Sequence, residues 1–167
     1  VALGARTLIR LGTCGAVQAS VQPTDLVIAT AACPLDGTTL QYLQGDRYAP
    51  AASYRVVRAL ADAAASVGAR HHVGLIATQD ALYGVDEGWV DRWRRRGVLA
   101  QEMEASIIFT VAGMYGLDAG CVLVTSNAAG RHERLADDDL APSVDAMIRV
   151  GLQALVALQT ANESPAG

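Results

Sequence analysis

Residues 6–15, RTLIRLGTCG, combine a short β-rich run with a glycine-bounded turn, and the interpretation of the whole chain starts from them. The run from Arg6 to Leu11 predicts a buried strand. Gly12 and Gly15 lie three positions apart and predict a loop that ends this strand, where a ligand could approach the backbone closely. The stretch therefore indicates a strand that leads into a binding loop.

Apolar runs alternate with helical patterns along the rest of the chain. Asp25 to Ala32 suits a strand covered on both faces, whereas the apolar residues of Ala51 to Val67 recur at helical spacing. This alternation predicts a three-layer α/β/α fold with a central mixed, largely parallel sheet. We expect one domain over residues 1–161 and a disordered tail over residues 162–167. The other expected elements are a long loop from Pro34 to Pro50, strands at His72–Thr78 and Ala119–Thr125, and helices at Asp86–Arg96, Ala105–Tyr115 and Ser143–Ala161.

The composition is that of a soluble globular domain with 51% hydrophobic and 18% charged residues. A net charge of −4 argues against nucleic-acid binding, which requires a concentrated basic surface. We see no signal peptide and no apolar run of roughly 18 residues, so we expect no membrane association and a cytoplasmic location. The three cysteines and three histidines show neither metal-ligand spacing nor a disulfide framework.

Three expected strands end in polar residues that should meet at one edge of the sheet, because the carboxyl ends of parallel strands lie together. These ends are residues 10–15, 78–80 and 125–127. An arginine in an apolar strand is costly unless an anion neutralises it, so Arg10 with Thr13 is a candidate phosphate site. An equally good interpretation is that Arg10 pairs with an internal carboxylate and that the glycines only shape a turn.

Glu102-Met103-Glu104 comes directly before an apolar helix. Acidic side chains there complement the helix dipole, and this is the simpler explanation of the pair. Two carboxylates at alternate positions could also accept hydrogen bonds from the vicinal hydroxyls of a ribose. Tyr83 and Trp89 could line a pocket for a flat base, although single aromatic residues more often serve packing.

Taken together, the motifs resemble those of the nucleoside phosphorylase family, which contains uridine phosphorylases and hexameric purine nucleoside phosphorylases. The segment from Leu3 to Gln18 is similar to the family's Arg-Ile-Gly-Thr-x-Gly segment. The Asp36-Gly37-Thr38 loop, the stretch from Val73 to Tyr83, and residues 101–106 (QEMEAS) follow in the family's order.

The resemblance implies phosphorolysis, in which inorganic phosphate cleaves the N-glycosidic bond of a uridine or purine nucleoside to give the free base and ribose 1-phosphate. It implies no cofactor or metal, with phosphate as co-substrate, and a homo-oligomer built from dimers that can assemble into a hexamer. An arginine at position 10 favours phosphorolysis over the hydrolysis carried out by related nucleosidases. A nucleosidase, or a module that binds nucleosides without cleaving them, is the alternative. By position, the catalytic residues would be Arg10, Glu104 and Asn127; phosphate would bind Arg10 and Thr13, ribose Met103 and Glu104, and the base Cys14, Gly15, Leu82, Tyr83 and Glu102.

The sequence departs from the family pattern at three places. Leu82 stands where the family usually has a base-stacking phenylalanine. Asn127 stands where hexameric purine enzymes have an aspartate, and this favours pyrimidine or 6-oxopurine bases. Against a pyrimidine, the Gln-x-Arg pair with which many uridine phosphorylases bind uracil is absent between Tyr83 and Trp89. The family's segment before the first strand, with its phosphate loop, has no counterpart before Val1. We therefore expect the 167-residue chain alone to be weakly active or inactive.

Overall fold

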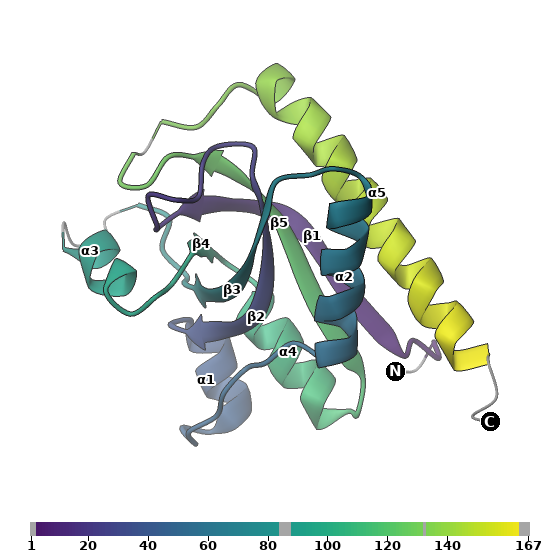
Figure 1. Cartoon of the computed structure of the whole chain (residues 1–167). Coiled ribbons are helices and arrows are strands. Elements are labelled where there is room, and N and C mark those ends of the chain that lie inside the picture. The colour runs from purple at the N-terminus through teal and green to yellow at the C-terminus, as the bar shows by residue number, and fades with distance from the viewer. Residues whose placement is uncertain (1–2, 84–87, 132, 164–167) are drawn as a thin grey trace.

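The computed structural model describes residues 3–83, 88–131 and 133–163, which form a mixed α/β structure (Figure 1). The order of elements along the chain is ββααβαβαβα. The strands are β1 (Thr7–Ala16), β2 (Leu26–Pro34), β3 (His71–Thr78), β4 (Ala100–Glu102) and β5 (Asp118–Asn127). The helices are α1 (Gly37–Leu43), α2 (Tyr54–Ser66), α3 (Trp89–Arg94), α4 (Ala105–Met114) and α5 (Asp137–Glu163).

The α/β class and the mixed sheet predicted from the sequence are confirmed, and the sheet in addition closes on itself. Its strands are ordered β1-β4-β3-β2-β5, and β5 pairs with β1 to complete a barrel. Pairs β1–β5, β2–β3 and β3–β4 are parallel, whereas β1–β4 and β2–β5 are antiparallel. Closure provides hydrogen-bond partners for backbone N–H and C=O groups that would be unpaired at the edges of an open sheet.

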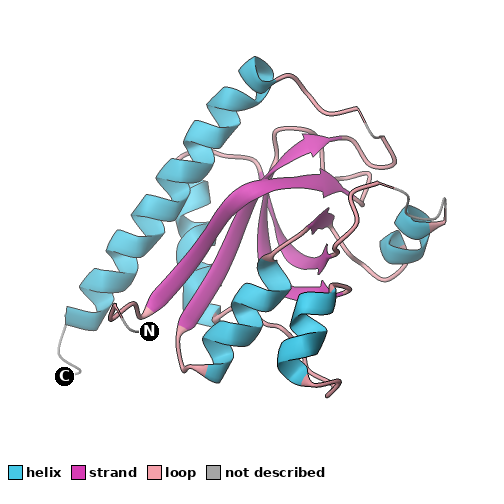
Figure 2. Ribbon diagram, turned by 180° about the vertical axis from the view of Figure 1, so that it is seen from behind, coloured by secondary structure: helices cyan, strands magenta, loops and turns pink. Residues whose placement is uncertain are grey.

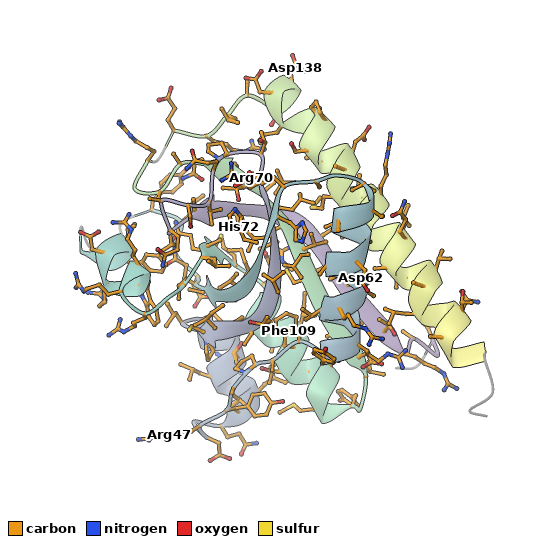
Figure 3. All side chains as sticks on the ribbon, viewed as in Figure 1. Arg47, Asp62, Arg70, His72, Phe109 and Asp138 are labelled. Carbon is orange, nitrogen blue, oxygen red and sulfur yellow. The ribbon has the colours of Figure 1, made fainter. Side chains whose placement is uncertain are left out.

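Helices cover the barrel on two sides. On one side α2 packs against α5, and α5 runs along β1 and β5, as Figure 2 shows from behind. On the other side α4 contacts β1, β2, β3 and β5, and α1 packs against α4. Phe109 of α4 points into this second core and is 1% exposed (Figure 3). The apolar cluster under α4 and the apolar cluster under α2 and α5 therefore lie on opposite faces of β1. Each side chain of β1 points toward only one of these two faces.

Two strand predictions differ from the structure. β1 does not stop at Leu11 but continues to Ala16, so the segment expected to be a loop is strand. It continues because Gly12, Thr13 and Cys14 pair in register with β5, and Gly15 and Ala16 pair with β4. β4 was not predicted, since three residues are too short to show a period. It exists because β1 and β3 both present free edges to it.

Two helix predictions also need correction. The expected loop from Pro34 to Pro50 contains α1, whose first turn is capped by Asp36: its side chain accepts a hydrogen bond from the backbone N–H of Thr39 at 2.7 Å. α5 begins at Asp137 rather than Ser143, with Pro142 in its second turn, where it removes only one intrahelical hydrogen bond. α5 ends at Glu163, two residues beyond the predicted domain boundary, and residues 164–167 lie outside the described residues. The predicted start of the helix at Asp86 also lies outside them.

α5 is long and apolar enough to cross a membrane by length and composition, contrary to the expectation that no such segment exists. The same composition is found in core helices of soluble proteins. α5 contacts α2 and the sheet through a buried face formed by Leu140, Met147, Val150, Ala154 and Leu158. Only 28% of its apolar window is buried, and Ile148, Leu152 and Val156 are exposed.

Candidate functional site

Arg10 is paired with two acidic side chains from the β4–α4 junction. Its Nε donates to Oε2 of Glu102 at 2.9 Å, and its Nη2 donates to Oε2 of Glu104. Burial alone would lower the pKa of Arg10, but the hydrogen bond to Glu102 and the surrounding negative charges raise it above its usual value. The guanidinium is therefore a permanent cation at this end of the barrel.

Gly12 lets the Arg10 side chain lie flat along β1. A Cβ atom at Gly12 would stand 2.6 Å from Nη1 and 2.9 Å from Cζ of Arg10. The backbone dihedral φ of Gly12 is not positive, so conformational freedom is not what requires glycine here. The requirement is space for the guanidinium.

Glu102 is an internal carboxylate rather than a group facing solvent. Its side chain has 0% exposure, and its Oε2 also accepts hydrogen bonds from the backbone N–H groups of Glu104 and Ala105, at 2.8 and 2.9 Å. Oε1 accepts from Oγ1 of Thr78 at 2.5 Å. The expectation that Glu102 contacts the base is not supported, because protein groups surround its carboxylate. It instead fixes Arg10 and stabilises the positive end of α4.

Glu104 and Met103, the two residues predicted to contact a sugar, are both accessible to solvent. The Glu104 side chain is 53% exposed although it pairs with Arg10, and Met103 is 38% exposed. Glu104 immediately precedes α4, so its backbone is fixed while its carboxylate can move. Of the residues predicted to bind phosphate and sugar, the structure thus brings Arg10 and Glu104 together.

Thr13 does not join Arg10. Residues of a strand alternate between faces, so Thr13 shares the face of Leu11, and Leu11 approaches Gly151 of α5. Thr13 is exposed, and no hydrogen bond links it to Arg10. The two halves of the predicted phosphate site therefore lie on opposite faces of β1.

The residues predicted to contact the base divide into two groups. Gly15 adjoins Asn127, since a Cβ on Gly15 would lie 3.1 Å from Oδ1 of Asn127. Cys14, in contrast, is 4% exposed with its thiol 3.7 Å from Oγ1 of Thr125, and burial raises its pKa to about 12. It is a neutral core residue. Leu82 and Tyr83 are 57% and 86% exposed.

Asn127 is held by the loop that follows β5. Its Nδ2 donates to the carbonyl oxygen of Arg131 at 2.5 Å, and its Oδ1 accepts from Oγ of Ser126 at 3.2 Å. Two further amides near it had no assigned role in the sequence: Gln79 and Gln101 are joined by a hydrogen bond of 3.3 Å. In the sequence, only two features could have pointed to them: Gln79 comes directly after a predicted strand, and Gln101 begins the QEMEAS motif.

A hollow of about 480 Å³ lies between α2 and α5. It borders Arg55, Arg58, Asp62 and Gln153, on the side of the barrel away from the Arg10 face. It holds none of the residues singled out by the motifs. Within the three described ranges, no cluster of His, Cys, Asp or Glu could hold a metal ion.

The structure is a closed, mixed α/β barrel with a charged cluster where β1, β3 and β4 meet α4. A family model, the phosphorylase superfamily, matches residues 1–157, and the chain belongs to that family. The chain is 36% identical over 163 residues to a guanosine phosphorylase of Halorubrum lacusprofundi, covering 93% of this chain and 67% of that protein. It is 40% identical over 134 residues to a uridine phosphorylase of Thermococcus kodakarensis, covering 72% of this chain and 48% of the relative.

A purine nucleoside phosphorylase of the DeoD type from Geobacillus kaustophilus is 33% identical over 153 residues, covering 92% of this chain and 64% of the relative. The chain thus spans from about half to two thirds of the length of these three relatives. All three relatives are named as nucleoside phosphorylases, but the names specify different nucleosides: guanosine, uridine and purine nucleosides.

Proposed function

We propose that the protein cleaves the N-glycosidic bond of a nucleoside with inorganic phosphate, releasing the free base and (deoxy)ribose 1-phosphate. The observation that carries this proposal is the Arg10–Glu104 pair at the accessible end of the barrel. Arg10 can bind an anion, and the carboxylate of Glu104 can bind hydroxyl groups. The names of the relatives support the same reaction.

Arg10 makes two ion pairs with different roles in the proposed reaction. The pair with Glu102 stays in place, and the pair with Glu104 opens when substrates bind. Glu102 is buried and binds Nε, which fixes the guanidinium in place. Glu104 is half exposed, and exposed ion pairs contribute only about 0–1 kcal/mol, so substrates can replace it at low cost. Phosphate would take Nη2 of Arg10, while the ribose hydroxyls would take the carboxylate of Glu104.

In the proposed reaction, a phosphate oxygen forms a bond to C1′ and the bond from C1′ to the base nitrogen breaks, its electron pair leaving with the base. The proton that remains on the phosphate ester passes to the base. Arg10 would hold the phosphate, Glu104 and Met103 would position the sugar, and Asn127 would lie at the leaving base. Such positioning supplies much of the rate enhancement in reactions of this kind.

Thr13 can join the phosphate only if the end of β1 rearranges, so we assign phosphate binding here to Arg10. The base is a purine or uracil, as the three relatives' names allow. We further propose that the reaction uses no metal or cofactor, that the protein is cytoplasmic, and that it works as a homo-oligomer.

The test is cleavage of uridine, inosine, guanosine and adenosine by the full-length protein, with and without phosphate, followed by separation of base and sugar products. We expect cleavage only with phosphate, and ribose 1-phosphate as product. Equal cleavage without phosphate would indicate a nucleosidase instead. Binding of a nucleoside without any cleavage would indicate a binding module.

A further inference from the structure

Three neutral amide side chains converge on Gly15 where β1, β4 and β5 end. Gly15 pairs directly with Gln101 across the β1–β4 ladder and with Asn127 across the β1–β5 ladder. Gln79, one residue after β3, reaches Gln101 from the other side. These residues, which we call the amide cluster, come from four segments distant in the sequence.

Glycine at position 15 lets the amides of Gln101 and Asn127 lie against the backbone of β1. A Cβ atom there would lie 3.1 Å from Oδ1 of Asn127 and 3.3 Å from Nε2 of Gln101, tighter than ordinary contact. The φ angle of Gly15 is not positive, so the backbone does not itself require glycine. The absence of a side chain is what lets both amides lie this close to the β1 backbone.

The hydrogen bonds of the amide cluster set which amide atoms lie beside Gly15. Gln79 donates from Nε2 to Oε1 of Gln101, which leaves Nε2 of Gln101 as a donor beside Gly15. Asn127 donates its own Nδ2 to the Arg131 carbonyl, and its Oδ1, which accepts from Oγ of Ser126, keeps a second lone pair as an acceptor beside the same glycine. One donor and one acceptor suit the edge of a base that carries a carbonyl next to a ring N–H.

The amide cluster also lies within reach of the sugar site. Gln101 lies in β4 and Met103 in the bend between β4 and α4, so two residues of chain, at most about 7 Å, separate their Cα atoms. The carboxylates nearest in sequence, Glu102 and Glu104, are both engaged by Arg10. The described groups beside Gly15 are therefore amides rather than acids.

We propose that Gln101, oriented by Gln79, determines base specificity by donating a hydrogen bond to a carbonyl oxygen of the base. This rests on the proposed phosphorolysis and names its substrate class: nucleosides of lactam bases, such as inosine, guanosine and uridine. When C1′ separates from a lactam base, the electron pair left on the base spreads onto its carbonyl oxygen. A neutral N–H donor stabilises that oxygen, whereas adenine has no such oxygen.

The experiment compares inosine with adenosine and uridine with cytidine, because each pair differs in a carbonyl against an amino group. For the full-length protein we expect kcat/KM to favour inosine and uridine. Gln101→Glu replaces the donor with an acceptor and should lower the inosine-to-adenosine ratio of kcat/KM by about tenfold or more, the cost of losing one buried hydrogen bond. Gln79→Leu should shift the ratio in the same direction by less.

The matched control is Gln153→Glu, the same change at an exposed position of α5, which should leave the ratio unaltered. If Gln101→Glu does not fold, Gln101→Met removes the donor without adding charge. A folded variant whose ratio stays within about twofold of the wild type would refute the role of Gln101, and so would a wild type that prefers adenosine. A wild type that cleaves no nucleoside with phosphate would refute the proposed function, and the role of Gln101 with it.

Discussion

The guanidinium of Arg10 in β1 binds the carboxylate of Glu104, 94 residues later at the start of α4. The pair joins a strand that is fixed on both sides to a carboxylate that is half exposed. In the proposed reaction each partner has its own substrate, so the ion pair must open when both substrates bind. This relationship makes the following predictions specific.

Arg10→Gln should lower kcat/KM for phosphate by about ten- to a hundredfold, because hydrogen bonds from a charged donor contribute about 1.5–3 kcal/mol. The effect should fall on phosphate more than on the nucleoside. Initial rates at varied phosphate concentration measure it. Arg149→Gln, at an exposed position of α5, is the control and should behave like the wild type. An unchanged phosphate dependence would remove Arg10 from the site.

Glu104→Gln should strengthen phosphate binding in the absence of nucleoside, because Nη2 of Arg10 is no longer shared with a carboxylate. The gain should be small, about two- to fivefold, as expected for an exposed ion pair. The same variant should raise KM for the nucleoside. Calorimetric titration with phosphate gives the first quantity and steady-state kinetics the second. Weaker phosphate binding would contradict the exchange of partners.

Glu102→Gln should destabilise the fold by about 3 kcal/mol, since it leaves a partly buried arginine without its internal partner. Glu104→Gln is the matched control because it removes the other carboxylate from the same arginine, and it should cost less than about 1 kcal/mol. Urea unfolding at neutral pH measures both. Equal losses would mean that Glu102 is not the internal anchor described here.

Gly12→Ala should displace the Arg10 guanidinium, because the added Cβ would stand 2.6 Å from Nη1. We expect phosphate affinity to fall by about tenfold, the loss of one charge-assisted hydrogen bond, with the fold retained. Gly151→Ala places a Cβ at a similar distance, 2.7 Å, from the flexible end of Leu11, but in a helix. That control should leave phosphate affinity unchanged, and a loss of equal size in both variants would argue against a specific effect on Arg10.

Asp36 should make stability depend on acidic pH. It is 2% exposed and accepts hydrogen bonds from Ser106 and Thr39. Burial alone would raise its pKa, but these hydrogen bonds lower it below the usual value. A lowered pKa in the folded state means that the ionised carboxylate stabilises the fold above about pH 4, and that this stabilisation is lost as pH falls through the lower folded pKa.

Asp36→Asn should therefore be less stable than the wild type at pH 7 and lose less stability between about pH 5 and pH 2. Thermal unfolding across that range measures the difference. The exposed Asp62 of α2, labelled in Figure 3, provides the control substitution, Asp62→Asn, which should keep the wild-type pH dependence. Parallel curves for the wild type and Asp36→Asn would show that the hydrogen bonds do not favour the ionised form.

The sequence by itself determined the α/β class, most element positions and the residues worth testing. Helical and strand periods are local, so α2, α4 and β3 could be predicted to within a few residues. Arg10 and the acids at 102 and 104 stood out because charged groups at the ends of apolar elements need partners. Both interpretations of Arg10 were open, and in this structure its partners are two carboxylates of the same chain, the buried Glu102 and the half-exposed Glu104.

Only the tertiary structure decided which of these residues are buried and which are accessible. β4 and the last part of β1 depend on strands that are distant in the sequence, so no local pattern reveals them. Within β4, alternation turns Glu102 toward the core and Gln101 toward the opposite face, and a shift of one residue in register would exchange them. That register, set by the closure of the barrel, makes Glu102 an anchor, leaves Glu104 accessible and places Gln101 beside Gly15.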